Sequence, residues 1–109
     1  MKNNSSTVVL TLNAKVAELM AARIKARRKK TGLTLEELCK RAGIASTTPK
    51  NRMWEIENGT AKGGLRLGTL YALAIALECK PSDLMPSIDE VLAGASIEAV
   101  TEKTLKVVP

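Results

Sequence analysis

The placement of helix-starting and helix-stopping residues in one stretch of the chain constrains the fold more than any other feature. Residues 33–59, LTLEELCKRAGIASTTPKNRMWEIENG, contain two start signals and two stop signals in alternation. A capping box or a cap residue followed by proline begins a helix, and glycine ends one. In chain order these signals are Thr34 with Glu37, Gly43, Thr48 with Pro49, and Gly59. The stretch therefore predicts two short helices, the first running to residue 42 and the second over residues 49–58, joined by a turn.

Further helices are predicted on both sides of this pair. Residues 14–30 carry apolar side chains at helical spacing, with Asn13 as the cap. Residues 67–78 predict another helix, a short one follows around Leu84, and residues 87–93 predict another turn or two. The chain has one Trp, one Tyr and no Phe, so its core must be aliphatic. The predicted fold class is all-α, with five helices.

Two apolar segments near the ends of the chain predict short strands. Residues 7–12, TVVLTL, are β-branched and apolar, and residues 104–108, TLKVV, alternate weakly. The two segments would pair with each other, either within one chain or across a dimer. The expected organisation is an N-terminal arm with its strand at 1–13, a helical domain at 14–93, and a C-terminal tail at 94–109 that provides a strand or a dimer contact.

The residue types present argue against catalysis and against a metal site. The chain has no histidine, the commonest general base and metal ligand, and Cys39 and Cys79 lack CxxC spacing. No glycine-rich phosphate loop follows a predicted strand. We therefore expect no enzyme activity, no cofactor and no small-molecule ligand. No apolar run approaches the ~20 residues that span a bilayer, and the cysteines are those of a reduced protein, so we expect a cytoplasmic protein without membrane association.

The positive charge of the chain is concentrated in its middle. The whole chain carries +6, whereas residues 15–66 hold thirteen Lys or Arg against five Glu, which is +8. Such an asymmetry favours a polyanionic partner, either nucleic acid or an anionic membrane surface. The alternative is a merely solvated basic face. For Lys25 and the basic residues that follow it to Lys30, favourable interaction with the helix dipole is a further explanation.

Three strings together resemble a known family. RRKKTGLTLEELCKRAGI, then IENG, then LGTLYALAIALECKPSDLM are similar to the lambda-repressor-like helix-turn-helix domain of the Xre/Cro type, over residues 18–86. The spacing from Ile44 to Ile56 is longer than is usual in that family, and the extra residues fall in ASTTPKNR. Because Met53 and Ile56 occupy core positions, the insertion is placed in the turn. A lengthened turn of this kind is similar to that of some restriction-modification controller proteins, and Arg52 followed by Met53 fits that variant.

The resemblance implies which residues contact DNA, and their chemistry agrees. Lys50 and Asn51 match the family's base-contacting positions on the first turn of the second helix, Arg52 matches the longer-turn variant, and Glu55 lies one turn further along. Lys or Arg can donate to guanine, Asn can pair with adenine, and Glu can accept from cytosine. The alternative is that these polar side chains only face solvent at the start of the helix and do not contact DNA. Phosphate contacts are expected from Thr34, Thr48 if its hydroxyl is not used for capping, Asn58, Thr60, Lys62 and Arg66.

Two further residue roles are expected. Arg28 and Glu57 match a family ion pair that ties the first helix to the end of the third, so both are excluded from the DNA contacts. Trp54 is expected in the core or at its rim rather than stacked on bases, because these domains bind paired DNA.

The leading functional hypothesis is a sequence-specific double-stranded DNA-binding transcriptional regulator. The resemblance suggests a repressor or autoregulator that binds an inverted repeat as a homodimer, with residues 84–109 and the strand at 7–12 forming the dimer surface. One alternative is an antitoxin-type protein-interaction module that also binds its own promoter. Another is a nonspecific binder of nucleic acid or anionic membranes.

Overall fold

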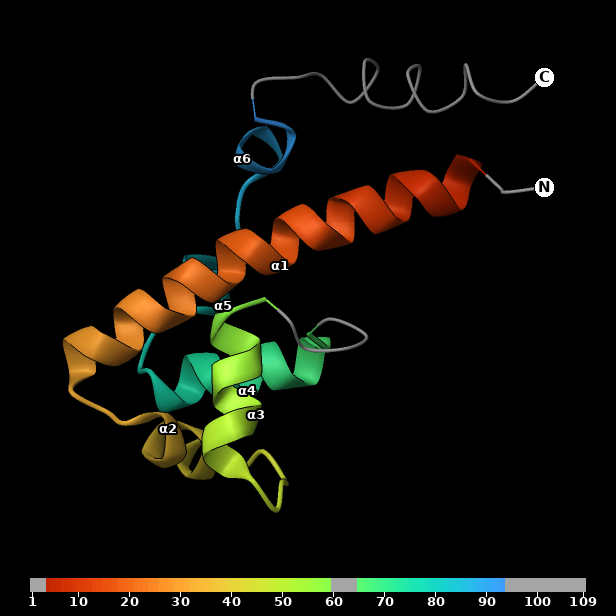
Figure 1. Ribbon diagram of the computed structural model, residues 1–109. Helices are drawn as coiled ribbons and strands as arrows, with labels where there is room; N and C mark the ends of the chain where they lie inside the picture. The colour runs from red at the N-terminus through yellow and green to blue at the C-terminus, as the bar shows by residue number, and fades with distance from the viewer. Residues whose placement is uncertain (1–3, 60–64, 94–109) are drawn as a thin grey trace.

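The computed structural model describes residues 4–59 and 65–93, and all the regular structure in these ranges is helical (Figure 1). The helices are α1 (Asn4–Thr31), α2 (Leu35–Arg41), α3 (Pro49–Glu57), α4 (Leu67–Ala76), α5 (Pro81–Leu84) and α6 (Ile88–Leu92). The all-α class is therefore confirmed. The five predicted helices are all present, and the turn expected at residues 87–93 forms α6.

The predicted N-terminal strand is wrong. Residues 7–12 are part of α1, which begins at Asn4 and continues through the expected cap, Asn13. A β-branched run has only a weak preference for a strand and needs a neighbouring strand to complete its hydrogen bonds. No such strand lies in residues 4–59 or 65–93, whereas a helix pairs its backbone groups internally. The strand predicted at 104–108 lies outside the described residues.

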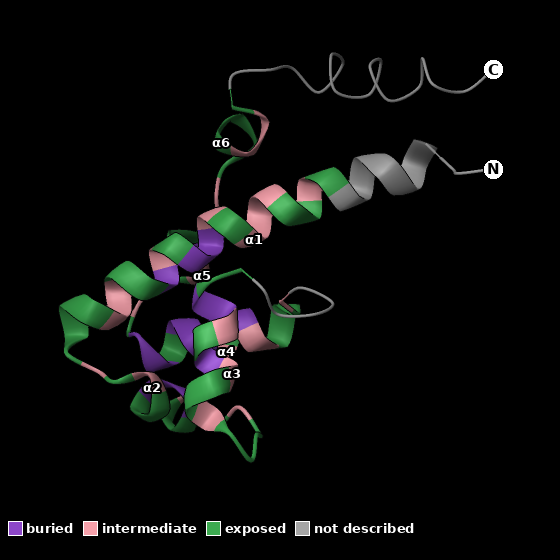
Figure 2. Ribbon diagram, viewed as in Figure 1, coloured by how far each residue is buried: buried purple, intermediate pink, exposed green. Residues whose placement is uncertain are grey.

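The core is aliphatic, as expected, and draws on five of the helices (Figure 2). Its largest fully buried side chains are Ile24, Leu38, Met53, Leu73, Leu84 and Cys39. Neither Trp54 nor Tyr71 belongs to it, since about half of each residue is exposed. The apolar positions of the predicted helices thus mark the core, and the aromatics lie on the surface.

Local signals set most of the helix ends. Thr34 caps α2: its hydroxyl accepts from the Glu37 N–H at 3.1 Å, and the Glu37 carboxylate accepts from the Thr34 N–H at 2.9 Å. Gly43 follows α2 with φ of 70°, a conformation that glycine adopts without steric cost. α4 ends two residues before its predicted limit, because Leu77 caps it and Glu78 adopts a positive φ of 54°.

Long α1 holds the last two helices through polar contacts. Arg23 pairs with Glu90 of α6 and donates from Nη1 to the Met85 carbonyl at 2.6 Å. Arg27 lies 3.8 Å from the Asp83 carboxylate of α5. These contacts come from the C-terminal half of α1, the part that packs over the other helices in Figure 1.

Candidate nucleic-acid interface

The helices α2 and α3 share the most extensive contact between helices in the described structure. Leu38 and Cys39 of α2 and Met53 and Ile56 of α3 are all buried. Half-buried Ile44 anchors the connecting turn: its N–H donates to the Cys39 carbonyl at 3.1 Å, and the Cys39 thiol donates to the Ile44 carbonyl at 3.6 Å. Burial raises the pKa of Cys39, which keeps the thiol protonated for this bond. The orientation of α3 is therefore fixed by packing.

The start of α3 is at Pro49, as predicted, after a turn over residues 42–48. Thr48 occupies the cap position but makes no side-chain capping bond; instead its N–H donates to the Ser46 hydroxyl oxygen at 3.0 Å. Proline lacks an N–H, so one of the unpaired donors at this end is absent. The Thr48 hydroxyl is exposed and not used for capping, which was the condition for its proposed phosphate contact.

The predicted base-contacting residues do not share one environment. Lys50 and Asn51 are exposed on the first turn of α3. Arg52 is half-buried, and its positive charge lies near enough to the Cys39 thiol to oppose the increase in its pKa. Glu55 is also half-buried. The structure therefore places Lys50 and Asn51 in solvent, and Arg52 at the edge facing α2.

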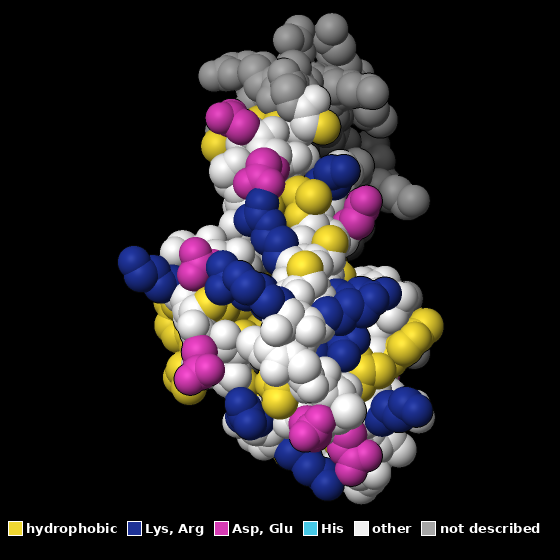
Figure 3. All heavy atoms as spheres, turned by 90° about the vertical axis from the view of Figure 1, so that its left-hand side faces the viewer, with side chains coloured by type: hydrophobic (Ala, Val, Ile, Leu, Met, Phe, Trp, Pro, Cys, Tyr) yellow, Lys and Arg dark blue, Asp and Glu magenta, His cyan; other side chains and the backbone are white. Residues whose placement is uncertain are grey.

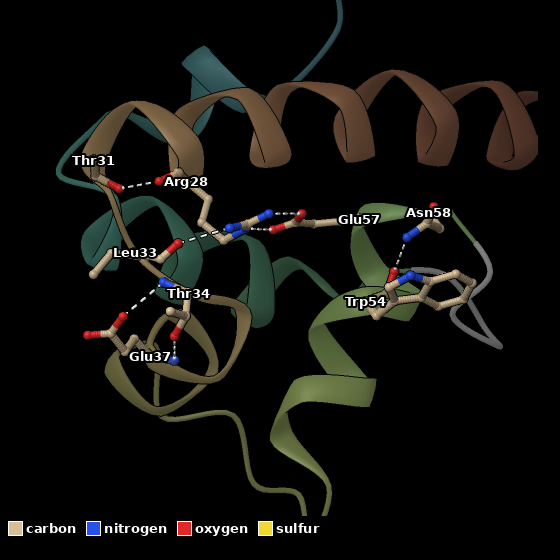
Figure 4. A network of polar contacts seen from close by, with 8 residues as sticks. All are labelled: Arg28, Thr31, Leu33, Thr34, Glu37, Trp54, Glu57 and Asn58. Atoms are coloured by element: carbon tan, nitrogen blue, oxygen red, sulfur yellow. Dashed lines mark hydrogen bonds and ion pairs between the residues drawn. The ribbon is translucent and has the colours of Figure 1, made fainter.

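Behind this surface, Arg28 of α1 and Glu57 of α3 form the expected ion pair (Figure 4). Arg28 Nε and Nη2 donate to the two carboxylate oxygens at 2.5 and 3.0 Å, and Nη1 donates to the Leu33 carbonyl at 2.9 Å. Only 2% of the Glu57 side chain is exposed. This pair points away from the outer surface of α3 and joins α1, α3 and the segment before α2.

Trp54 was expected either in the core or at its rim, and the structure does not place it in the core. It is 52% exposed, and Figure 4 shows its indole on the opposite side of α3 from Glu57. Asn58 donates from Nδ2 to the Trp54 carbonyl at 2.8 Å and caps the helix. Sequence reasoning did not place Trp54 on the outer face. Its spacing of four residues from both Lys50 and Asn58 puts the three on one side of α3, but the packing of α3 determines that this side is exposed.

The predicted phosphate-contacting residues that the structure describes are exposed. Thr34 lies at the start of α2, and Arg66 immediately precedes α4. In Figure 1, α2 and the beginning of α4 lie on opposite sides of α3. Asn58 has already committed one amide hydrogen to the Trp54 carbonyl. Thr60 and Lys62 lie outside the described residues.

Basic side chains are distributed over the molecule rather than confined to α3. Figure 3 shows Lys and Arg over much of the side that faces left in Figure 1, interspersed with Asp and Glu. Several of the basic residues have structural partners: Arg23, Arg27, Arg28 and Lys40 all form ion pairs. Part of the positive charge between residues 15 and 66 therefore stabilises the fold. No helix in residues 4–59 and 65–93 has the length and apolar character needed to cross a membrane.

A short helix with polar side chains exposed on its first turn, held across a turn by a second helix, is the arrangement typical of the helix-turn-helix class of DNA-binding domain. The family model of the Cro/C1-type HTH DNA-binding domain matches residues 23–90, which is more than half of the chain. The chain therefore belongs to this family, and the predicted relationship to lambda-repressor-like domains is confirmed. No curated protein and no solved structure matches the chain significantly. The likeness of the turn to restriction-modification controllers, and the domain limits at 14 and 93, stay predictions.

Proposed function

We propose that this chain is a sequence-specific transcriptional regulator, a repressor or autoregulator, that binds an inverted repeat in double-stranded DNA as a homodimer. The observation that carries the proposal is the exposure of Lys50 and Asn51 on the first turn of α3, a helix whose orientation is fixed by buried contacts with α2. Side chains of these types on a helix held in a fixed orientation suit base recognition, because hydrogen bonds to base edges require defined geometry.

In this proposal, the N-terminal end of α3 enters the major groove. Asn51 pairs with adenine through its amide, and Lys50 donates to guanine O6 or N7. Arg52 donates to a guanine from the α2 side, and Glu55 accepts from cytosine N4. Thr34, Thr48, Asn58, Thr60, Lys62 and Arg66 contact phosphates around this centre and set the register of the helix.

We include a homodimer because a single recognition helix contacts only a short stretch of DNA. One short recognition helix contacts only a few base pairs, so useful specificity requires two half-sites about one helical turn, or ~34 Å, apart. The proposed dimer surface centres on residues 84–109 and includes the surfaces of α1 and α4 that border Met85. In its described part, Met85 and Ile88 are exposed, and Met85 lines an apolar hollow together with Val16 and Leu67. Burial of these side chains against a second copy would be favourable.

Selection of bound duplexes from random DNA tests the proposal. A regulator of this kind should enrich a motif with two inverted half-sites, and Asn51→Ala should remove the preference at one position of each half-site. A matched control is Asn13→Ala, which changes an exposed asparagine in the N-terminal half of α1. Failure to enrich any sequence, with folded protein, would contradict the proposal, whereas a single unrepeated half-site would contradict only the dimer.

An antitoxin-type role is a second candidate, favoured by the surface of α4. Leu67, Tyr71 and Ile75 recur every four residues along this helix, and all three are exposed, Ile75 by 78%. Side chains at this spacing share one helix face, so they form an apolar stripe that a protein partner could cover. Co-purification from the native cell at stoichiometric amounts, lost on Ile75→Glu with DNA binding intact, would support this role.

A further inference from the structure

The outer face of α3 contains one residue whose exposure the proposed polar contacts do not explain. Met53, Ile56 and Glu57 are buried, whereas Lys50, Asn51, Trp54 and Asn58 are exposed. Trp54 is three residues after Asn51 and four after Lys50, and residues at these spacings are neighbours on one helix face. The indole therefore lies beside the two side chains that are best placed to contact bases.

This position is unusual for a tryptophan. A Trp side chain carries a large apolar surface, and its exposure to water forgoes the stabilisation that burial would give. Met53 and Ile56, its neighbours on α3, are packed into the core, while Trp54 is outside the core cluster. The indole also points away from the Arg28–Glu57 pair (Figure 4). Trp54 therefore stabilises neither the core nor this ion pair. An apolar ligand surface on the DNA side would account for it.

We infer that Trp54 is a specificity-determining residue that packs its indole against the C5-methyl group of a thymine in the major groove. This inference rests on the proposed DNA-binding function and assigns one of its base preferences. Among the base edges exposed in the major groove, the thymine methyl is the apolar group, and it is the contact that apolar side chains make there. The bases remain paired and stacked, so the indole meets the edge of the thymine rather than its face.

The spacing along α3 places this thymine close to the base read by Asn51. A helix rises ~1.5 Å per residue, so Trp54 lies ~4.5 Å further along the axis than Asn51. The two side chains leave one face of α3 less than one turn apart, so the thymine and the base that Asn51 contacts belong to the same half-site.

Asn58 holds the backbone beneath the indole. Its Nδ2 and its N–H both donate to the Trp54 carbonyl, at 2.8 and 3.0 Å. These two bonds fix the last turn of α3 and so the direction in which the Trp54 side chain leaves the helix.

The test replaces thymine by deoxyuridine, which pairs identically but lacks the methyl group, at each position of the selected site in turn. Wild-type binding should weaken about fourfold at one thymine per half-site, the effect expected for one buried methyl group. Trp54→Ala should bind the thymine and deoxyuridine sites equally, while Trp54→Phe should keep part of the difference. Tyr71→Ala changes an equally exposed aromatic residue on α4. This variant should keep the full difference in affinity between the thymine and deoxyuridine sites.

Fluorescence provides a second measurement, because Trp54 is the chain's one tryptophan. Bound DNA should protect its emission from acrylamide quenching, in both the wild type and Tyr71→Ala. Equal binding of thymine and deoxyuridine by the wild type at every position, or unchanged quenching in the complex, would overturn the inference. If selection enriches a site, either of these two results leaves the proposed function intact. The absence of any enriched site refutes the proposed function itself.

Discussion

Arg28 and Glu57 join α1 to α3 through two parallel hydrogen bonds of 2.5 and 3.0 Å, and the carboxylate is almost completely buried. The third bond of the guanidinium, to the Leu33 carbonyl, brings the segment before α2 into the same network. The pair therefore helps to set the positions of α2 and α3 from the side that faces α1.

Glu57→Gln should strongly destabilise the domain. The substitution leaves the Arg28 guanidinium, only 13% exposed, without its counter-charge, and loss of one partner of a buried pair costs roughly 3–5 kcal/mol of unfolding free energy. Chemical denaturation measures the change. Glu36→Gln, which breaks the exposed pair with Lys40, is the control and should have little effect. Similar losses of unfolding free energy in both variants would show that the buried pair contributes no more to stability than the exposed pair.

Asn51→Ala and Arg66→Ala should affect DNA binding in different ways. Loss of Asn51 removes a base contact, so affinity for the selected site should fall by ~1–3 kcal/mol while binding to random DNA stays the same. Loss of Arg66 removes a phosphate contact, so both affinities should fall together and the salt slope should flatten by about one unit. Titrations at several salt concentrations measure both quantities. Equal effects of Asn51→Ala on the two kinds of DNA would contradict its base-contacting role.

Glu90→Gln should remove part of the acid sensitivity of α6. The Ser87 N–H and the Arg23 guanidinium lower the pKa of Glu90 to about 2. Because the pKa of this group is depressed by folding, its contribution to stability is complete above the unfolded value of ~4.3 and disappears as the pH falls toward 2. The wild type should therefore protect the α6 amides from hydrogen exchange better than Glu90→Gln at pH 6. The difference should vanish near pH 2, and a difference that persists there would exclude the carboxylate as its cause.

Met85→Glu should dissociate the proposed homodimer. The side chain lines the apolar hollow with Val16 and Leu67, and a carboxylate buried there against a second copy would lack a partner. Sedimentation equilibrium measures the change in dimer affinity. Ile75→Glu, on the exposed stripe of α4, is the matched control and should leave the dimer intact. If instead Ile75→Glu dissociates it and Met85→Glu does not, the interface lies around Tyr71 and Ile75 of α4 rather than around Met85, and a monomeric wild type would refute the homodimer altogether.

The sequence by itself determined the parts of this protein that depend on residues a few positions apart. The capping box of Thr34 and Glu37 located α2, and Pro49 at the first helical position located α3, because these signals act on the backbone within a single turn. The same boundaries placed Lys50 and Asn51 on the first turn of α3. The family resemblance added the pairing of Arg28 with Glu57, which no local pattern predicts.

Only the tertiary structure decided the features that depend on contacts distant in the chain. Residues 7–12 extend α1 although their composition favours a strand, because a strand needs a partner and a helix does not. Arg52 lies toward Cys39 of α2, and Trp54 faces solvent, because the packing of α3 against α1 and α2 sets which side of the helix is buried. Periodicity shows that a helix has two faces, but only its neighbours determine which residues remain on the outer one.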